Sequence, residues 1–310
     1  MHRAGETVAG LAAALLTCVG AEAALADQPF LFGAYTGEKL AQFETLIGHS
    51  ISIDDHFQTF SELPKAGVAE DIADGLVPMI SWSSNKAQGG GGGSVLAQDI
   101  LNGNYDSQLD DQADAIAALG GTVLIEWEPE MTDNPRNALF MAGVAPDEWG
   151  PTYVAVWIHI HDLFVARGAT NVQWVWSPGG TAYESHWHVG IPCQAYFPGT
   201  AYVDWMGLHS YNKSPHAEAY DANSEFLAFY AQAPVWAPGK PLIHSQTGAT
   251  HSTDAQSEWI STAQTDLKTE FPLVRGFVWF NADSAGSRKY SLSGQGLTDF
   301  SAMAADPYFQ

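Results

Sequence analysis

Three glutamates crowd one short segment of the chain. Residues 124–131 read Leu-Ile-Glu-Trp-Glu-Pro-Glu-Met, which places acidic side chains at Glu126, Glu128 and Glu130. In an extended strand, residues two apart point to the same side, so the three carboxylates are expected to face one space. Crowded like charges raise the pKa of each carboxyl group, and a raised pKa suits a general acid near neutral pH. The spacing therefore predicts acid–base chemistry, although one or two of these glutamates would also fit structural hydrogen bonds.

Aromatic residues stand near the ends of several apolar runs elsewhere in the chain. Trp82, Trp176 and Trp279 lie at or near the ends of such runs, and Tyr211 follows another closely. Sugars stack their apolar faces on aromatic rings, while their hydroxyl groups bond to a few well-placed polar side chains. A single tryptophan is more often part of a packed core. The set as a whole, taken with the glutamates, favours a cleft for a glycan.

The elements that must position these residues alternate along the chain. Eight short apolar runs are predicted to be strands, at residues 30–35, 50–54, 77–82, 122–128, 172–177, 203–209, 241–246 and 276–281. Between them, apolar residues recur at helical spacing, most clearly from Trp149 to Phe164. Eight strand–helix units with no change of composition favour an α/β protein, a single (β/α)8 TIM barrel. An open doubly wound sheet is the alternative, but no Gly-x-Gly-x-x-Gly follows the first strand.

A barrel of this kind places its working side chains at the carboxyl ends of the strands. Reading those ends gives a set rich in carboxylates and aromatic rings: Tyr35, Asp54, Asp55, Trp82, Glu126, Glu128, Glu130, Trp176, His209, Tyr211, Gln246, Trp279 and Asp283. Two long segments, the glycine-rich 88–94 and 131–146, are expected on the same rim, where a loop can border a site.

Composition and motifs exclude several classes of ligand. Twelve Lys and Arg stand against 35 Asp and Glu, and the formal charge of −23 argues against nucleic acid and against an anionic polysaccharide. A neutral ligand is compatible. No metal site or cofactor is predicted, because His159 and His161 face different ways on a helix and His186 and His188 lack a third ligand. No Gly-x-Ser-x-Gly elbow of a serine hydrolase is present.

The N-terminus is typical of an export signal. An apolar run at 8–16 is followed by Ala24-Leu25-Ala26, which fits a cleavage site. We predict a signal peptide at 1–26 and one domain at 27–310, secreted or periplasmic and not attached to a membrane after cleavage. Lipid attachment is not expected, because Thr17 precedes Cys18 where a lipobox has a small residue. We expect the mature chain to be a monomer without a disulfide framework.

Several short segments form a recognisable set, at residues 80–82, 100–103, 105–106, 127–131, 171–178, 196–199, 202–207, 211–212 and 239–241. Together they resemble glycoside hydrolase family 26, whose best-known members are endo-β-1,4-mannanases. The resemblance covers nearly all of the chain after the export signal. It implies a retaining hydrolase, with Glu130 as the general acid/base and residue 246 at the nucleophile position. Retention requires two carboxyl groups about 5–5.5 Å apart on either side of the scissile bond.

The chain departs from the family pattern at that position. Gln246 stands where the family has its nucleophilic Glu, Glu126 stands where it usually has Arg, and Pro129 where it often has His. A carboxamide is a poor nucleophile and carries no charge to stabilise the transition state. Three hypotheses follow. Another carboxylate, Glu126 or Glu128, takes over the attack; a more distant base activates water in an inverting reaction; or the barrel binds a glycan without cutting it.

The resemblance implies a secreted hydrolase of a β-linked neutral polysaccharide, with β-mannan as the first candidate. The residues expected to bind substrate are Trp82, Glu126, Glu128, Trp149, Tyr211 and Trp279. Tyr211 is further expected to bond the group at Gln246. The alternative is a glycan-binding protein without catalysis, serving exopolysaccharide processing or export.

Overall fold

The computed structural model describes residues 28–87, 92–132, 135–180, 191–213, 217–250, 253–283 and 289–310. The predicted signal peptide at 1–26, the histidines at 186 and 188, and residues 88–91 of the glycine-rich segment lie outside the described residues. Within the described part of the chain, no helix is both long enough and apolar enough to span a membrane.

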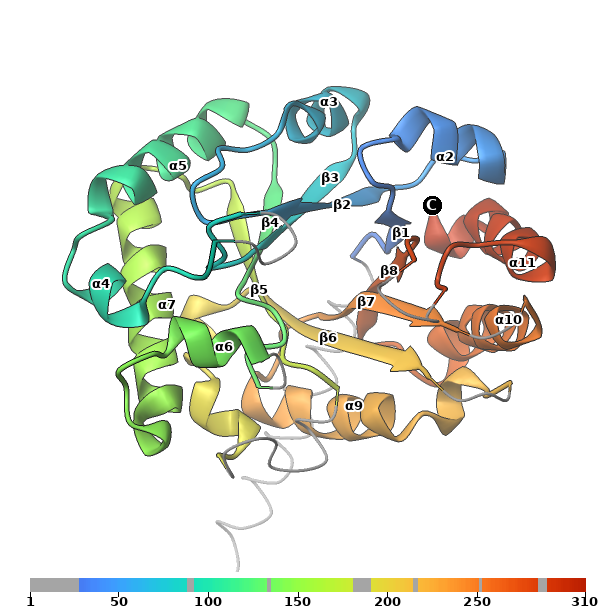
Figure 1. Cartoon of the computed structure of the whole chain (residues 1–310). Coiled ribbons are helices and arrows are strands. Elements are labelled where there is room, and N and C mark those ends of the chain that lie inside the picture. The colour runs from blue at the N-terminus through green and yellow to red at the C-terminus, as the bar shows by residue number, and fades with distance from the viewer. Residues whose placement is uncertain are drawn as a thin grey trace, which may run out of the picture.

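Eight parallel strands close into a barrel, which confirms the (β/α)8 prediction (Figure 1). They are β1 Leu31–Tyr35, β2 Ile53–Gln58, β3 Val77–Trp82, β4 Val123–Trp127, β5 Val172–Trp176, β6 Trp205–Asn212, β7 Leu242–Ala249 and β8 Val274–Phe280. Each strand pairs with the next along the chain, and β1 pairs with β8 over five residues to close the ring.

A ring of helices surrounds the strands (Figure 1). The helices are α2 Leu40–Ile47, α3 Ala66–Asp74, α4 Ala97–Leu101, α5 Asp106–Leu119, α6 Pro135–Phe140, α7 Trp149–Ala166, α9 Ser224–Trp236, α10 Thr253–Thr269 and α11 Gly294–Ala305. Short 3-10 turns lie at Pro146–Glu148 (η2), Cys193–Tyr196 (η3), Thr200–Tyr202 (η4), Tyr220–Ala222 (η5) and Pro307–Phe309 (η6).

The helices bury one apolar face each, as their periodicity predicts. In α5, Leu109, Ala113 and Ile116 are buried against the barrel. In α2, Phe43 and Ile47 are buried, whereas Leu46 on the other side is 55% exposed. Gly48 ends this helix with a positive φ of 74°, a conformation that glycine adopts at little cost.

The apolar core has two layers because successive strand residues point to opposite faces. One residue from each strand fills the lower lumen: Leu31, Ile53, Met79, Leu124, Val175, Trp205, Ile243 and Val278. The alternate residues, with most of the large aromatic side chains, pack between the strands and the helices. Residues further along each strand, on the inward side, therefore face the upper lumen and its mouth.

The second strand differs most from the prediction. It spans Ile53–Gln58 rather than 50–54, because Asp54 and His56 are buried inside the strand instead of ending it. Buried charges are stable only when they are paired. Asp54 accepts hydrogen bonds from the backbone and the hydroxyl of Thr36, and His56 bonds two carboxylates.

Candidate active site

The upper lumen is lined by small and polar side chains two positions beyond the apolar floor. Asp55, Ser81 and Glu126 follow the floor residues of β2, β3 and β4 in this way, and Ser177 follows β5. Gly207 on β6 leaves room for Ser177, since a Cβ there would lie 1.8 Å from the Ser177 hydroxyl oxygen. The result is a compact polar layer directly above an apolar plug.

The chain turns sharply after β4, which corrects the prediction for the three glutamates. Glu128 and Glu130 have positive φ values of 44° and 57°, which residues other than glycine rarely adopt. The strand ends at Trp127, so the three carboxylates do not continue along one extended face. Backbone hydrogen bonds hold this turn, from Glu128 N–H to Trp82 O at 2.7 Å and from Glu130 N–H to Ser177 O at 3.0 Å.

The three carboxylates therefore have different surroundings. Glu126 is fully buried in the lumen, and the Glu130 side chain is 33% exposed at the rim. Glu128 is 5% exposed and accepts hydrogen bonds from the backbone and hydroxyl of Ser84, at 2.5 and 2.9 Å. Neither Glu126 nor Glu128 is open to the mouth, so the structure does not place either carboxylate where a substrate would bind.

His209 on β6 lies between Glu126 and Glu130. Its Nε2 is 3.0 Å from a Glu126 oxygen, and its Nδ1 is 3.2 Å from a Glu130 oxygen. Burial by itself would lower the pKa of His209, but the charge of Glu126 and hydrogen bonds to both glutamates raise it to about 10. The ring is thus an imidazolium at neutral pH, and both of its nitrogens donate.

The charge of His209 also decides the behaviour of Glu126. Burial alone would raise the pKa of Glu126, but the positive charge and hydrogen bond of His209 hold that pKa below its usual value. The expectation that crowding raises the pKa of this glutamate is therefore wrong. A cation supplied by a distant strand outweighs the repulsion between acidic neighbours.

Gln246 on β7 is held in one orientation by its neighbours. Its carboxamide oxygen accepts from the Tyr211 hydroxyl at 3.0 Å, which confirms the predicted contact. Its nitrogen donates to Asp55 at 3.0 Å. The Ser81 hydroxyl is 2.8 Å from Asp55 and 3.1 Å from Glu126, so hydrogen bonds run without a break from Gln246 towards the other side of the lumen.

Asp55 is the second titratable group of this layer, and its role could not be read from the sequence. It is 1% exposed. Burial, and then the negative charge of Glu126, raise the pKa of Asp55 to about 7. A carboxyl group in contact with Gln246 therefore titrates near neutral pH, close to the nucleophile position of the family.

Aromatic rings line the mouth beside this layer. Tyr35 meets Phe57 edge to face and stacks on Phe280, with ring centroids 4.7 and 5.6 Å away. Tyr290 joins Phe280 at 5.7 Å and Tyr211 at 4.9 Å. Tyr290 is buried, whereas the other four rings are half-buried and keep part of their surface open. We call these five residues the aromatic platform.

Two of the tryptophans predicted for the cleft lie elsewhere. Trp82 is 1% exposed and packs against Trp127, and Trp279 is fully buried with its indole nitrogen on the Tyr290 carbonyl oxygen. Trp149, at the start of α7, is half-buried against the outer core. Trp82 and Trp279 point away from the lumen, because both stand at outward-facing positions of their strands, and the substrate contact predicted for Trp149 stays a prediction. Phe280, one residue beyond Trp279, stands at an inward-facing position.

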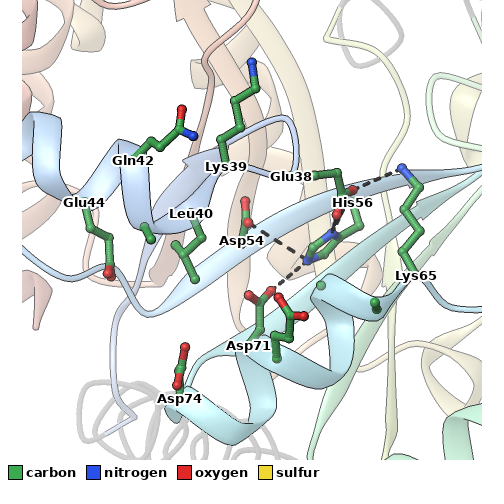
Figure 2. Close-up of a pocket in the computed structure, with 14 residues that line it drawn as sticks. Glu38, Lys39, Leu40, Gln42, Glu44, Asp54, His56, Lys65, Asp71 and Asp74 are labelled. Atoms are coloured by element: carbon green, nitrogen blue, oxygen red, sulfur yellow. Dashed lines mark hydrogen bonds and ion pairs between the residues drawn. The ribbon is translucent and has the colours of Figure 1, made fainter.

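A second ionised cluster lies on the flank of the barrel, between α2 and α3 (Figure 2). Figure 2 shows His56 between Asp71 and Glu38. The His56 ring nitrogens lie 2.7 Å from Asp71, 3.1 Å from Glu38 and 4.0 Å from Asp54. A pocket of about 490 Å³ opens beside it. Asp54, His56 and Asp71 are close enough together to share a metal ion.

The flank cluster is better described as a buried ion pair. Burial alone would lower the pKa of His56, but hydrogen bonds to Asp71 and Glu38 raise it to about 10. A proton therefore occupies the nitrogen that a metal ion would need, and both nitrogens already donate to carboxylates. The cluster ties β2 to α3 and to the segment before α2.

Comparison with known proteins places the fold. No family model matches the chain. Endoglucanase H of Acetivibrio thermocellus is 24% identical over 291 residues, which cover 86% of this chain and 29% of that protein. This chain thus spans less than a third of the length of that relative.

Solved structures are similar over a larger share of both chains. A GH26 β-mannanase from Bacteroides ovatus matches with a TM-score of 0.62 and 16% identity, over 94% of each chain. The catalytic domain of a GH26 endo-β-1,4-mannanase from a Bacillus species matches with a TM-score of 0.64 and 15% identity, over 94% of this chain and 90% of that one. The chain has the fold of the family 26 mannanases.

Proposed function

We propose that this protein is a glycoside hydrolase acting on a β-linked neutral glycan, with β-mannan as the first substrate to test. One observation carries the proposal. In a barrel with the fold of family 26 mannanases, the partly exposed Glu130 carboxyl group stands at the strand carboxyl ends, bonded to the same polar layer as Gln246. The aromatic platform beside it offers ring faces on which sugars stack.

The proposed mechanism gives Glu130 the role of general acid. Its Oε1 accepts from His209, and the other oxygen of the protonated carboxyl group gives its proton to the leaving glycosidic oxygen. Gln246 forms no covalent intermediate, because its carboxamide is a poor nucleophile and both of its ends are engaged by Tyr211 and Asp55. Glu126 and Glu128 are too buried to attack in its place. Water is therefore the nucleophile, and the ionised carboxylate form of Asp55, whose pKa is about 7, accepts the proton that the water loses.

A second candidate function is glycan binding without cleavage. The observation that favours it is the burial of Asp55, which is 1% exposed and covered from the mouth in this state. A base that water does not reach leaves the aromatic platform and Glu130 as a binding surface only. The predicted export signal suits either function, since both concern a polysaccharide outside the cytoplasm.

The test is a panel of glycans offered to the purified protein. Soluble β-mannan, mixed-linkage glucan and xylan would be assayed for new reducing ends, and for binding by affinity electrophoresis. We expect cleavage of one of them. Binding with no new reducing ends would replace hydrolysis by the second candidate, and neither binding nor cleavage of any glycan would overturn both.

A further inference from the structure

We propose that His209 is the positioning residue of Glu130, with Glu126 as the buried counter-ion that keeps its ring charged. The catalytic consequence rests on the proposed function. The electrostatic arrangement does not, because it concerns only groups within the lumen.

Glu130 needs such a tether because of where the chain places it. It follows a turn in which residues 128 and 130 have positive φ, so no regular strand fixes its side chain. Its backbone N–H is bonded to Ser177 on one side. The His209 ring holds its carboxyl group from β6, at 3.2 Å. A general acid must be held within hydrogen-bonding reach of the leaving oxygen, and a ring fixed on a strand is a rigid support.

Glu126 explains how a cation can remain in this layer. His209 is 3% exposed, and an unpaired buried charge is costly. Glu126 is fully buried and 3.0 Å from Nε2, so its negative charge offsets that cost. Asp55 and His244 also act electrostatically on this region. His244 is neutral, because burial lowers its pKa to about 3, so it supplies no competing cation.

The same contacts separate positioning from ordinary core packing. If His209 only packed in the core, its substitution would slow all reactions of the site equally. If it positions Glu130, its loss will matter only where the leaving group needs a proton. A dinitrophenyl glycoside releases dinitrophenolate, a stable anion that needs no general acid, whereas the sugar hydroxyl group released from a polysaccharide does need one.

The first experiment compares His209→Gln with the wild type on these two kinds of substrate. We expect kcat on the polysaccharide to fall by roughly 10²-fold, the lower end of the range for general acid–base catalysis, with KM little changed. On the dinitrophenyl glycoside of the same sugar, kcat should stay close to wild type. His244→Gln is the matched control, since His244 is fully buried but bonds Tyr220 and Ser210 instead of Glu130. An equal loss on both substrates in His209→Gln would overturn the proposal.

The second experiment needs no turnover. The protonation of His209 would be followed by NMR of its ring carbons, in the wild type, in Glu126→Gln and in Glu130→Gln. We expect the ring to stay protonated beyond pH 9 in the wild type, and its midpoint to fall by roughly 1–3 units in each variant, most in Glu126→Gln. An unchanged midpoint in both variants would overturn the arrangement. Because this measurement requires no activity, a protein that cuts no glycan would refute the proposed function alone.

Discussion

Two histidines in this barrel have nearly the same electrostatic setting, in two regions with different roles. His56 on the flank and His209 in the lumen each donate from both ring nitrogens to carboxylates. Burial opposes protonation of each ring, yet their partners raise the pKa of both to about 10. Each ring is hydrogen-bonded to one buried carboxylate and to one that is about one-third exposed, which is Glu38 at 36% on the flank and Glu130 at 33% in the lumen.

The difference lies in what surrounds the exposed carboxylate. On the flank, Lys65 lies 3.0 Å from Glu38 and completes an ion-pair network between β2 and the helices. In the lumen, Glu130 stands above a polar layer that includes Gln246, at the carboxyl ends of the strands. A strongly shifted pKa therefore indicates a buried ion pair, and only its place in the barrel distinguishes catalysis from structure.

The largest expected effect is a loss of turnover that distinguishes Glu130 from Glu38. Glu130→Gln should reduce turnover of the best glycan by roughly 10²–10⁴-fold, because a carboxamide cannot donate the catalytic proton. Glu38→Gln removes an equally exposed carboxylate that also accepts from an imidazolium, and it should leave turnover close to wild type. Initial rates per folded molecule would be measured for both. Similar losses in the two variants would contradict the distinction between the clusters.

The barrel itself was predictable because its signal is periodic and local. Eight apolar runs separated by helical patterns leave few topologies, and the predicted bounds of β3 agree with the structure. The barrel inference uses only spacing along the chain. The contact between Tyr211 and Gln246 is confirmed too, but it followed from the resemblance to family 26, which assigned a role to position 246.

The rest depended on features that spacing does not contain. In the turn after β4, Glu128 and Glu130 adopt the left-handed backbone conformation with positive φ. This conformation is not predicted by the sequence, because neither residue is a glycine. The partners of His209 lie 79 and 83 residues away along the chain. The sequence interpretation did not assign which alternate residues of each strand point into the lumen. Counting from the apolar floor, as from Leu124 to Glu126 or from Val278 to Phe280, assigns the lumen residues and excludes Trp279.

The second prediction concerns stability and the flank. His56→Gln would leave Asp54 and Asp71, which are 1% and 2% exposed, without their cation. Breaking a buried ion pair in this way costs about 3–5 kcal/mol, so the free energy of unfolding should fall by that order. Turnover per folded molecule should not change. Urea denaturation at several pH values would measure the loss.

The sign of its pH dependence follows from the raised pKa. The folded pKa of His56 is about 10, above its ordinary value of 6.5. The stabilisation by this protonated ring is therefore fully present below pH 6.5 and is lost as the pH rises through 10. The gap between wild type and His56→Gln should be widest near pH 6. A gap that stays constant up to pH 10 would contradict the ion-pair assignment.

The third prediction restores a charge to the lumen. Gln246→Glu by itself would place a carboxyl group against Asp55, 3.0 Å from the present nitrogen, and the two groups would share a proton at neutral pH. The double variant with Asp55→Asn removes that competition and frees the new carboxylate. We expect it to gain retaining hydrolysis, roughly 10²-fold above the wild type, with the anomer of the product identified by NMR. A double variant no faster than the wild type would show that position 246 has lost its catalytic geometry.

The smallest expected effect is the change in the free energy of unfolding when Asp55 is replaced by Asn. Burial, with the nearby charge of Glu126, raises the pKa of Asp55 from 3.8 to about 7. Its contribution to stability is therefore fully present below pH 3.8 and is lost as the pH rises through 7, where the folded protein must ionise a buried group. Asp55→Asn keeps an oxygen for the Gln246 nitrogen. Its new nitrogen can donate to Ser81, whose own hydroxyl also reaches Glu126.

Asp55→Asn should accordingly be more stable than the wild type at pH 8, by on the order of 1–3 kcal/mol, with the advantage disappearing near pH 4. Chemical denaturation of both proteins at pH 4, 6 and 8 would measure this difference. Because the flank cluster is identical in the two proteins, its titration cancels in the comparison. If the advantage at pH 8 is absent, Asp55 ionises at an ordinary pH in the folded state, and a base poised near neutrality must be removed from the proposed mechanism.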